Sequence, residues 1–350
     1  MTRHPLEPRR IPVFLWSSLS PFRLYKIQCY NTQRILIISR QEVISMAGKL
    51  IECVPNFSEG RRQDVIESIV ANFRGVKGCS LLDYRADADH NRLVVSLAGD
   101  PDPVSEALIG AAKTAAAAID MNSHQGAHPR IGAVDVIPFT PIRGISMEEC
   151  VSLSHSFGER YFSELGIPVY FYEESAKCPE RKRLEVIRKG QYETLKMESV
   201  KPERNPDVGG PALHPTAGAT VIGARQFLVA FNVNLNTADE EIAKKIGTFV
   251  RASSGGFCHV KGMGVALSER GMTQVSMNIV DYQKNALYRV LELIRMEARR
   301  WGVEVVETEI YGMIPAQALL DSAAYYLQVK DFDPDQVLEL KLLGSGGMME

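Results

Sequence analysis

One order of secondary-structure signals occurs twice along this chain of 350 residues, and that duplication constrains the fold more than any other feature. In the first half, hydrophobic periodicity and turn residues predict a strand at 50–54, a helix at 65–73, strands at 79–84 and 92–98, a helix at 101–119 and a strand at 133–137. The second half repeats the order, with a strand at 227–235, a helix at 239–251, strands at 260–267 and 272–280, a helix at 285–301 and a strand at 303–310. A βαββαβ unit of this kind forms an antiparallel sheet with both helices on one face. The sequence therefore predicts an α+β fold (α/β sandwich) of two like-built subdomains, each with an open sheet face.

Helix starts are signalled by capping-box spacings, in which Ser or Thr is followed three residues later by Glu. Ser146 and Glu149 have this spacing, and they predict a helix that runs to Leu165 between the two halves. Thr237 and Glu240 have the same spacing at the start of the first helix of the second half. A further strand is predicted at 168–172.

The first 45 residues differ from the rest, because they hold seven Lys or Arg and only two Glu. An arginine-rich, acid-poor start is typical of an organelle transit peptide. Four prolines disfavour an amphipathic targeting helix, however, which favours a translated upstream segment with the true start at Met46. We therefore predict an N-terminal extension at 1–46 that is disordered or not native, an N-terminal subdomain at 47–225 and a C-terminal subdomain at 226–345.

Composition favours small-molecule chemistry. With 45% hydrophobic and 23% charged residues and a formal net charge of -2, the chain has the balance of a soluble globular protein, and we expect neither nucleic acid nor a membrane as partner. The six cysteines are scattered without a C-x-x-C pair, which favours a reducing cytoplasm and no thiolate metal site.

The stretch from His124 to Arg130 holds two imidazoles and a guanidinium within seven residues. Gly126 and Pro129 prevent a regular helix, so this stretch is predicted to be a loop. His128 is the candidate general acid or base, since an unperturbed imidazole titrates near ~6.5. Arg130 is a candidate for holding a substrate carboxylate through two parallel hydrogen bonds. The structural alternatives are a histidine satisfied in the core and an ordinary surface arginine.

Four further residues are candidates for supporting roles. Arg92 follows a hairpin and could reach into a cleft, although turn chemistry alone explains its neighbours. Asp135, on the strand after the histidine loop, either orients an imidazole or caps a turn. Alternation along the strand at 227–235 places Asn232 and Asn234 on one polar face, which suggests a wet site.

The stretch 207–218 contains too many glycines and prolines for a regular element. Composition alone fits a linker and a ligand-binding loop equally well.

Three collinear stretches carry a resemblance to a known family: CVPNFSEG at 53–60, HQGAHPRIGAVDV at 124–136 and GATVIGAR at 218–225. They resemble the formiminotransferase domain of the glutamate formimidoyltransferase family over about residues 50–343. The resemblance implies two ferredoxin-like subdomains that enclose a substrate tunnel between their sheets, with the proton donor at His128. It also implies a folate-binding loop formed by Gly209, Gly210, Pro211, Ala212, Leu213, His214, Pro215, Thr216, Ala217 and Gly218.

The implied reaction transfers the formimino group between N-formimino-L-glutamate and tetrahydrofolate, giving 5-formiminotetrahydrofolate and L-glutamate, a step of histidine degradation and one-carbon metabolism. Tetrahydrofolate is then a co-substrate, no metal is needed, Arg130 or Arg92 would hold the glutamate carboxylates, and a cytoplasmic homodimer is expected. A histidine that titrates near neutrality would protonate the departing amine.

Two differences from bifunctional relatives bear on the expected function: the sequence ends at Glu350, so the cyclodeaminase activity is expected to be absent, and Ala127 stands where an acid is expected. Three alternatives remain open from the residues: a 5-formyltetrahydrofolate:glutamate formyltransferase, a folate-binding module without turnover, and a metal-dependent hydrolase built on His124 and His128. The spacing of these two histidines lacks the glutamate of H-E-x-x-H and favours no zinc site.

Overall fold

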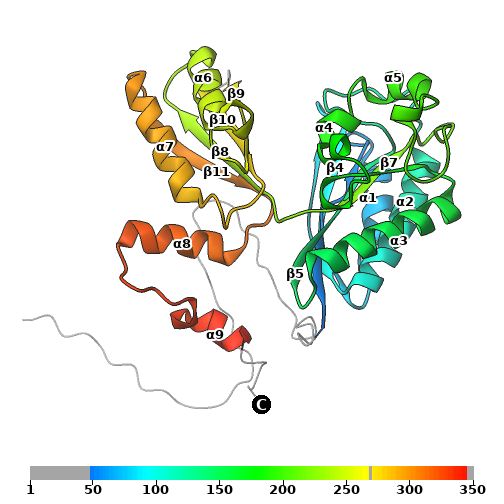
Figure 1. Cartoon of the computed structure of the whole chain (residues 1–350), viewed down its shortest axis with the longest axis horizontal. Coiled ribbons are helices and arrows are strands. Elements are labelled where there is room, and N and C mark those ends of the chain that lie inside the picture. Colours follow the sequence, from blue (N-terminus) through cyan, green and yellow to red (C-terminus); the bar gives the residue numbers. More distant parts are fainter. Residues whose placement is uncertain (1–47, 268–269, 345–350) are drawn as a thin grey trace, which may run out of the picture. The chain divides into compact units, whose positions relative to one another are not determined.

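The structure, a computed structural model, describes residues 48–267 and 270–344, and it contains two separate sheets (Figure 1). The predicted extension at 1–46 lies outside the described residues. In the first half the elements are β1 (Leu50–Cys53), β2 (Asn56–Phe57), α1 (Gln63–Ala71), β3 (Cys79–Asp87), β4 (Arg92–Gly99), α2 (Pro101–Ala118) and β5 (Val134–Arg143). The predicted order of strands and helices is therefore confirmed here. β1 and β2 both lie between β4 and β5 and pair antiparallel with each, while β3 pairs with the far edge of β4.

The first sheet is wider than its βαββαβ core. Beyond β5 it continues through β7 (Thr220–Ala224), which is parallel to β5, and then β6 (Val169–Phe171), which is parallel to β7. The helix α3 (Met147–Leu165) connects β5 to β6 and begins with the predicted capping box, because Ser146 Oγ accepts from Glu149 N and the Glu149 carboxylate accepts from Ser146 N. Parallel strands of one sheet need such a crossover connection.

Both faces of this sheet carry apolar side chains where they are covered. The helices α1, α2 and α3 pack on one face through the largest core cluster, which includes Ile69, Leu108 and Phe157. On the opposite face of β5, β7 and β6 lies a smaller cluster of Val136, Val221 and their neighbours. The short helices α4 (Leu184–Ile187) and α5 (Gln191–Glu198) contribute Ile187 and Leu195 to that cluster. The histidine loop, 124–130, lies in the chain just before β5.

The second sheet is antiparallel in the order β11-β8-β10-β9. Its elements are β8 (Val229–Leu235), α6 (Glu240–Val250), β9 (Val260–Leu267), β10 (Met272–Ile279), α7 (Leu287–Arg300) and β11 (Val305–Tyr311), followed by α8 (Ala316–Leu327) and α9 (Leu338–Gly344). One core cluster joins α6, α7 and the apolar face of the strands. The predicted α+β fold with a second βαββαβ unit is confirmed. The tunnel between the sheets and the subdomain boundaries at 47, 225 and 345 stay predictions.

The capping box predicted at Thr237 and Glu240 is wrong. The helix α6 has Asp239 as its N-cap, whose carboxylate accepts from Glu241 N at 3.0 Å. Thr237 instead accepts from Asp239 N at 3.1 Å and lies two residues before the N-cap. Asp caps a helix as well as Ser or Thr does, so the nearer acid displaced the pair with the expected spacing.

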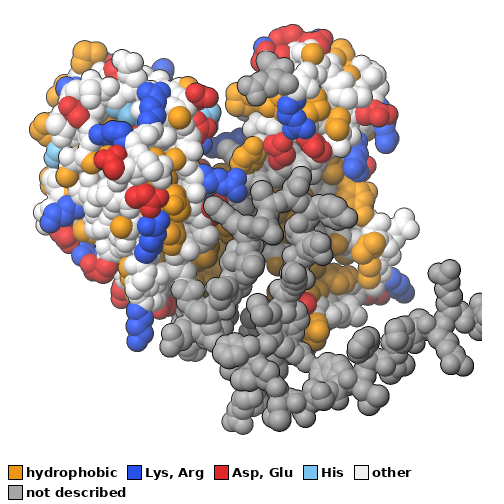
Figure 2. Space-filling model, turned by 180° about the vertical axis from the view of Figure 1, so that it is seen from behind, with side chains coloured by type: hydrophobic (Ala, Val, Ile, Leu, Met, Phe, Trp, Pro, Cys, Tyr) orange, Lys and Arg blue, Asp and Glu red, His pale blue; other side chains and the backbone are white. Residues whose placement is uncertain are grey.

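The surface carries no single dominant charge on the side that Figure 2 shows, where basic and acidic side chains are interspersed over both halves of the described chain. In residues 48–267 and 270–344, none of the helices combines the length and apolar content needed to cross a bilayer.

Candidate active site

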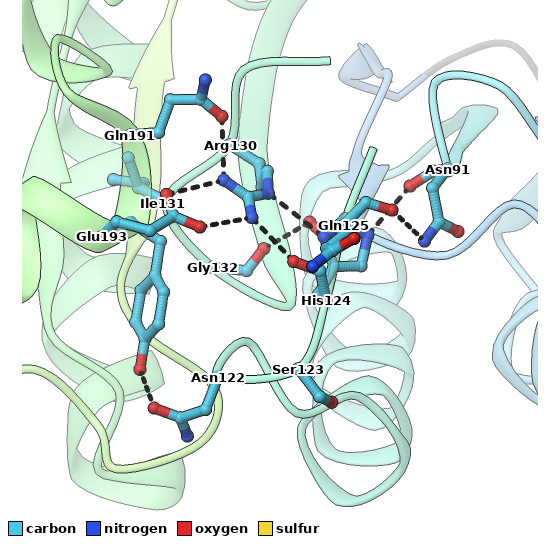
Figure 3. Close-up of polar contacts among 12 residues, drawn as sticks. Asn91, Asn122, Ser123, His124, Gln125, Arg130, Ile131, Gly132, Gln191 and Glu193 are labelled. Atoms are coloured by element: carbon cyan, nitrogen blue, oxygen red, sulfur yellow. Dashed lines mark hydrogen bonds and ion pairs between the residues drawn. The ribbon is translucent and has the colours of Figure 1, made fainter. Parts of the chain in front are cut away.

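Arg130 ties the histidine loop to α5 (Figure 3). Its guanidinium donates to Glu193 (2.7 and 3.0 Å), to Gln191 Oε1 (2.8 Å), and to both the carbonyl oxygen (2.8 Å) and the ring Nδ1 (3.1 Å) of His124. These five bonds use all five N–H groups of the guanidinium, and the side chain is only 6% exposed. Arg130 therefore braces the loop in this structure and has no donor left for a substrate carboxylate.

His124 is held in one tautomer. Because its Nδ1 accepts from Arg130, the proton of the neutral ring sits on Nε2, which lies 3.2 Å from the carbonyl oxygen of Asn91 and donates to it. Burial lowers the pKa of His124, which keeps the ring in this neutral form. Both ring nitrogens are thus occupied. No group of three or more metal-ligating side chains occurs among the residues that the structure describes, so the hydrolase alternative gains no support.

Asn91 connects the first motif to the histidine loop. Its backbone has φ 49°, its Oδ1 accepts from Gly60 N at 2.9 Å, and its Nδ2 donates to the carbonyl oxygen of Gln125 at 2.9 Å. An added Cβ on Gly126 would lie 2.3 Å from the carbonyl oxygen of His90, so this close approach requires glycine. The motif residues here are mainly a scaffold that fixes where the loop lies.

His128 is half-buried, and its imidazole makes no hydrogen bond to any residue described in the structure. Burial first, and then the nearby charges of Arg92, Arg188, His90 and Arg130, lower the pKa of His128 to about 3. The expectation that this histidine titrates near neutrality is therefore wrong for the unliganded chain, because a half-buried ring among cations resists a further positive charge. Such a ring must accept a proton before it can donate one.

Arg188 was not found from the sequence, yet it is central to this cluster. It follows α4, and its guanidinium donates to Asp135 Oδ2. The other oxygen of that carboxylate, Oδ1, accepts from Ile131 N at 2.9 Å. Asp135 therefore positions Arg188 and fixes the end of the histidine loop; it does not orient the imidazole of His128.

Arg92 stands at the start of β4 with no acidic partner within ion-pair distance in the described part of the chain. Burial and the charge of Arg188 lower the pKa of Arg92. The Nε atoms of Arg92 and Arg188 are both buried without a hydrogen-bond partner among the described residues. A buried N–H group that lacks an acceptor is costly, so these two Nε atoms favour a bound acceptor such as an anion.

The segment 207–218 is irregular, as predicted, and its end is joined to the histidine loop. Ala133 N donates to the carbonyl oxygen of Ala217 at 2.9 Å, and Ala219 N donates to that of Ile131 at 3.1 Å. The Nδ1 of His214 accepts from the backbone N–H groups of Thr216 (3.3 Å) and Ala217. The middle of the segment is exposed at Gly210, Pro211, Ala212, Pro215 and Thr216.

Asn232 and Asn234 lie on the polar face of the second sheet, as predicted. Asn232 Oδ1 accepts from Met277 N at 3.3 Å. Asn234 accepts through Oδ1 from Gln274 and donates through Nδ2 to Glu309. Asn234 is fully buried and Asn232 is 7% exposed. These polar groups sit on the face opposite to the helices.

Comparison with known proteins decides the family. A model of the formiminotransferase domain, N-terminal subdomain, matches residues 50–225, and a model of the formiminotransferase domain matches residues 230–340. The chain belongs to the formiminotransferase-domain family. It is 50% identical to a glutamate formimidoyltransferase from Streptococcus pyogenes serotype M1 over 297 residues, which covers 85% of this chain and 99% of the relative. It is 47% identical to a glutamate formimidoyltransferase from Thermoplasma acidophilum, again covering 85% of this chain and 99% of the relative.

Bifunctional relatives of this formiminotransferase domain extend further. The formimidoyltransferase-cyclodeaminase of Mus musculus is 44% identical over 284 residues, which covers 79% of this chain but 52% of the relative.

This formiminotransferase domain also holds a buried carboxyl group that sequence reasoning missed. Glu52 in β1 is 5% exposed and lies opposite Thr140 of β5, whose hydroxyl is buried without a partner among the described residues. Burial raises the pKa of Glu52 to about 7, although the charge of Arg225 opposes the shift. A single acid within the apolar run at 50–54 was the available signal, since glutamate is rarely fully buried.

The raised pKa of Glu52 predicts a pH-dependent stability. The folded chain holds the proton to a higher pH than the unfolded chain, so ionisation of Glu52 lowers the free energy of unfolding as pH rises from about 4.5 to about 7. We expect Glu52→Gln to raise the free energy of unfolding by about 2 kcal/mol at pH 8 and by much less at pH 5. Urea unfolding at both pH values tests this; an equal effect at both would show that Glu52 titrates normally.

Proposed function

We propose that this chain is a glutamate formimidoyltransferase that moves the formimino group between N-formimino-L-glutamate and tetrahydrofolate, giving 5-formiminotetrahydrofolate and L-glutamate. The observation that carries the proposal is a neutral imidazole at His128 beside two incompletely paired arginines, on a loop joined to the segment 207–218. The near-complete coverage of two relatives named for this activity supports it.

The proton balance of the reaction suits a neutral imidazole. The N5 atom of tetrahydrofolate attacks the amidine carbon and must lose its proton, while the nitrogen of glutamate must gain one as its bond to that carbon breaks. We assign both transfers to His128, which takes the proton from N5 and hands it to the departing amine. The ring begins and ends neutral, so one turnover consumes no external proton at this residue.

Arg92 and Arg188 are the proposed partners of the glutamate carboxylates. Both guanidinium groups are incompletely paired, whereas Arg130 is fully used within the protein. Of the two arginines suggested by the sequence, Arg92 therefore keeps the carboxylate role and Arg130 becomes a residue that positions the loop. Guanidinium groups bind carboxylates through charge-assisted hydrogen bonds.

The segment Gly209–Gly218 is the proposed folate-binding loop, and His214 is expected to hold its shape. We predict that His214→Ala weakens tetrahydrofolate binding by roughly 10-fold, because two backbone N–H groups lose their acceptor. His214→Asn is the matched control, since an asparagine oxygen accepts from N–H groups two and three residues later. Calorimetry with both variants measures the effect; equal affinities for His214→Ala and wild type would count against the loop assignment.

Two other functions fit the same residues: formyl transfer between 5-formyltetrahydrofolate and glutamate, and folate binding without turnover. A spectrophotometric assay with formimino and formyl donors side by side separates them from the proposal. We expect faster product formation from N-formimino-L-glutamate and tetrahydrofolate. A faster formyl reaction would support the first alternative, and binding without any product would support the second.

Tetrahydrofolate is the proposed co-substrate, and the proposed steps use no metal ion. A cytoplasmic homodimer stays a prediction, which sedimentation equilibrium of the purified chain tests for the oligomeric state.

A further inference from the structure

Four charged or titratable side chains near His128 oppose its protonation. Arg92 faces it from β4, Arg188 from the end of α4, His90 from the hairpin turn before β4 and Arg130 from its own loop. The nearby acids are already engaged: Asp135 with Arg188, Asp87 with His90 (2.8 Å), and Glu193 with Arg130. Of the three arginines, only Arg92 has no acid within ion-pair distance in the described part of the chain, so its positive charge lies unpaired next to the imidazole.

We propose that Arg92 and Arg188 form one subsite for a carboxylate of the amino-acid substrate, and that filling this subsite makes His128 basic enough to carry a proton. The inference rests on the proposed function and extends it to a coupling between substrate binding and protonation. His128 is then a switchable base, held neutral until the substrate arrives.

Geometry supports the subsite independently of the proton. Both arginines have a buried Nε without a partner among the described residues, although Nη2 of Arg188 donates to Asp135 Oδ2. Arg188 is 14% exposed and Asp135 only 2% at their side chains, so the pair is fixed in a place where water compensates little. A carboxylate that accepts from both guanidinium groups would supply the missing partners.

Anion binding and protonation of His128 are coupled because each one changes the electrostatic free energy of the other. An anion beside Arg92 and Arg188 cancels charge that now opposes protonation of His128, so it raises the basicity of the ring. By linkage, protonation of the ring must then strengthen anion binding by the same factor. The affinity for L-glutamate should rise as pH falls, by up to about tenfold for each pH unit below the value at which the occupied site titrates.

The coupling would also restrict turnover to donors that place a carboxylate between Arg92 and Arg188. A molecule that binds without a carboxylate in this subsite leaves His128 neutral and weakly basic, so N5 of the folate cannot lose its proton easily. Specificity then appears in kcat and not only in KM.

The test is calorimetric titration of wild-type protein with L-glutamate, and for comparison with the diamide of L-glutamate, which lacks both carboxylates, in phosphate and in Tris buffer from pH 6 to pH 8. Different ionisation enthalpies of the buffers reveal protons taken up on binding. We expect proton uptake with L-glutamate that increases toward pH 6, and neither proton uptake nor comparable affinity with the diamide. His128→Asn should still bind L-glutamate but without proton uptake.

Arg92→Gln is the principal variant, because Arg92 has no acidic partner in the described chain whose charge its loss would strand. It should weaken L-glutamate binding by about 10- to 100-fold. It should also raise the pKa of His128 in the free protein, measured by NMR titration with His128→Asn to assign the signal. Arg188→Lys, which keeps the positive charge and a donor to Asp135, should retain proton uptake.

The inference fails if wild type does not bind L-glutamate, if binding takes up no proton, or if His128→Asn takes up as many protons as wild type. The formimino-transfer assay separates this failure from failure of the proposed function. Active wild-type enzyme without proton uptake would leave the function standing and remove the coupling alone.

Discussion

Replacing His128 by alanine is expected to lower kcat by about 10²- to 10⁴-fold while tetrahydrofolate binding stays within about twofold of wild type. The proposed shuttle needs one group that takes the proton from N5 and gives it to the departing amine, and the structure offers no second unpaired imidazole in the described loop, because both ring nitrogens of His124 are used. The proposed folate contacts of the segment 209–218 come from other residues than His128, so we expect folate binding to persist.

The measurement combines the spectrophotometric transfer assay with calorimetric binding of tetrahydrofolate. Added free imidazole should restore part of the activity of His128→Ala, since a small base can enter the space left by the ring. Turnover equal to wild type would remove His128 from the mechanism. Loss of folate binding together with activity would show instead that the ring serves the folate site.

The largest structural effect is expected from Gly218→Ala, which should lower the free energy of unfolding by about 3 kcal/mol or more. Gly218 has φ 72°, where an alanine costs roughly 1–2 kcal/mol. In addition, its new Cβ would lie 2.3 Å from the carbonyl oxygen of Ile131, a backbone atom that cannot swing aside. Separating these two strands of backbone should also displace the histidine loop and reduce transfer activity.

Gly210→Ala is the matched control for this effect. Gly210 lies in the same segment with φ 77°, but nothing lies within 4 Å of a Cβ added there. Its cost should therefore be the conformational part alone, about 1–2 kcal/mol. Urea unfolding of both variants gives the comparison; equal losses would show that the junction between Gly218 and Ile131 is looser than the structure indicates.

Local sequence patterns were sufficient to predict the order of strands and helices in the core of each half. Alternating and helical periodicities predicted the βαββαβ order, since each strand and helix buries one face against its neighbours in sequence. The parallel strands β6 and β7 and the wider sheet were not predicted as such, because parallel pairing joins segments far apart in the chain. The short helices α4 and α5 were missed for a related reason, as they are too brief to show a clear period.

The same limit applies to the candidate site, where local patterns suggest single residues but not the distant residues that contact them. The sequence predicted His128 and Arg92 as candidate site residues, and these stay predictions. It could not show that the donors of Arg130 are bound by Gln191 and Glu193 of α5, which lie 61 and 63 residues further along the chain. Arg188 carries no local motif and acquires its role only when Asp135 is brought to it across the fold. The low pKa of His128 likewise results first from burial and then from the charges of Arg92, Arg188, His90 and Arg130, which only the fold brings together.

A crystal structure of the chain with a tetrahydrofolate analogue and L-glutamate would test the central claim most directly. The account predicts the His128 ring within about 2.6–3.2 Å of both the pterin N5 and the glutamate nitrogen, with a glutamate carboxylate between Arg92 and Arg188. Ligands bound elsewhere, or an imidazole turned away from both nitrogens, would contradict it.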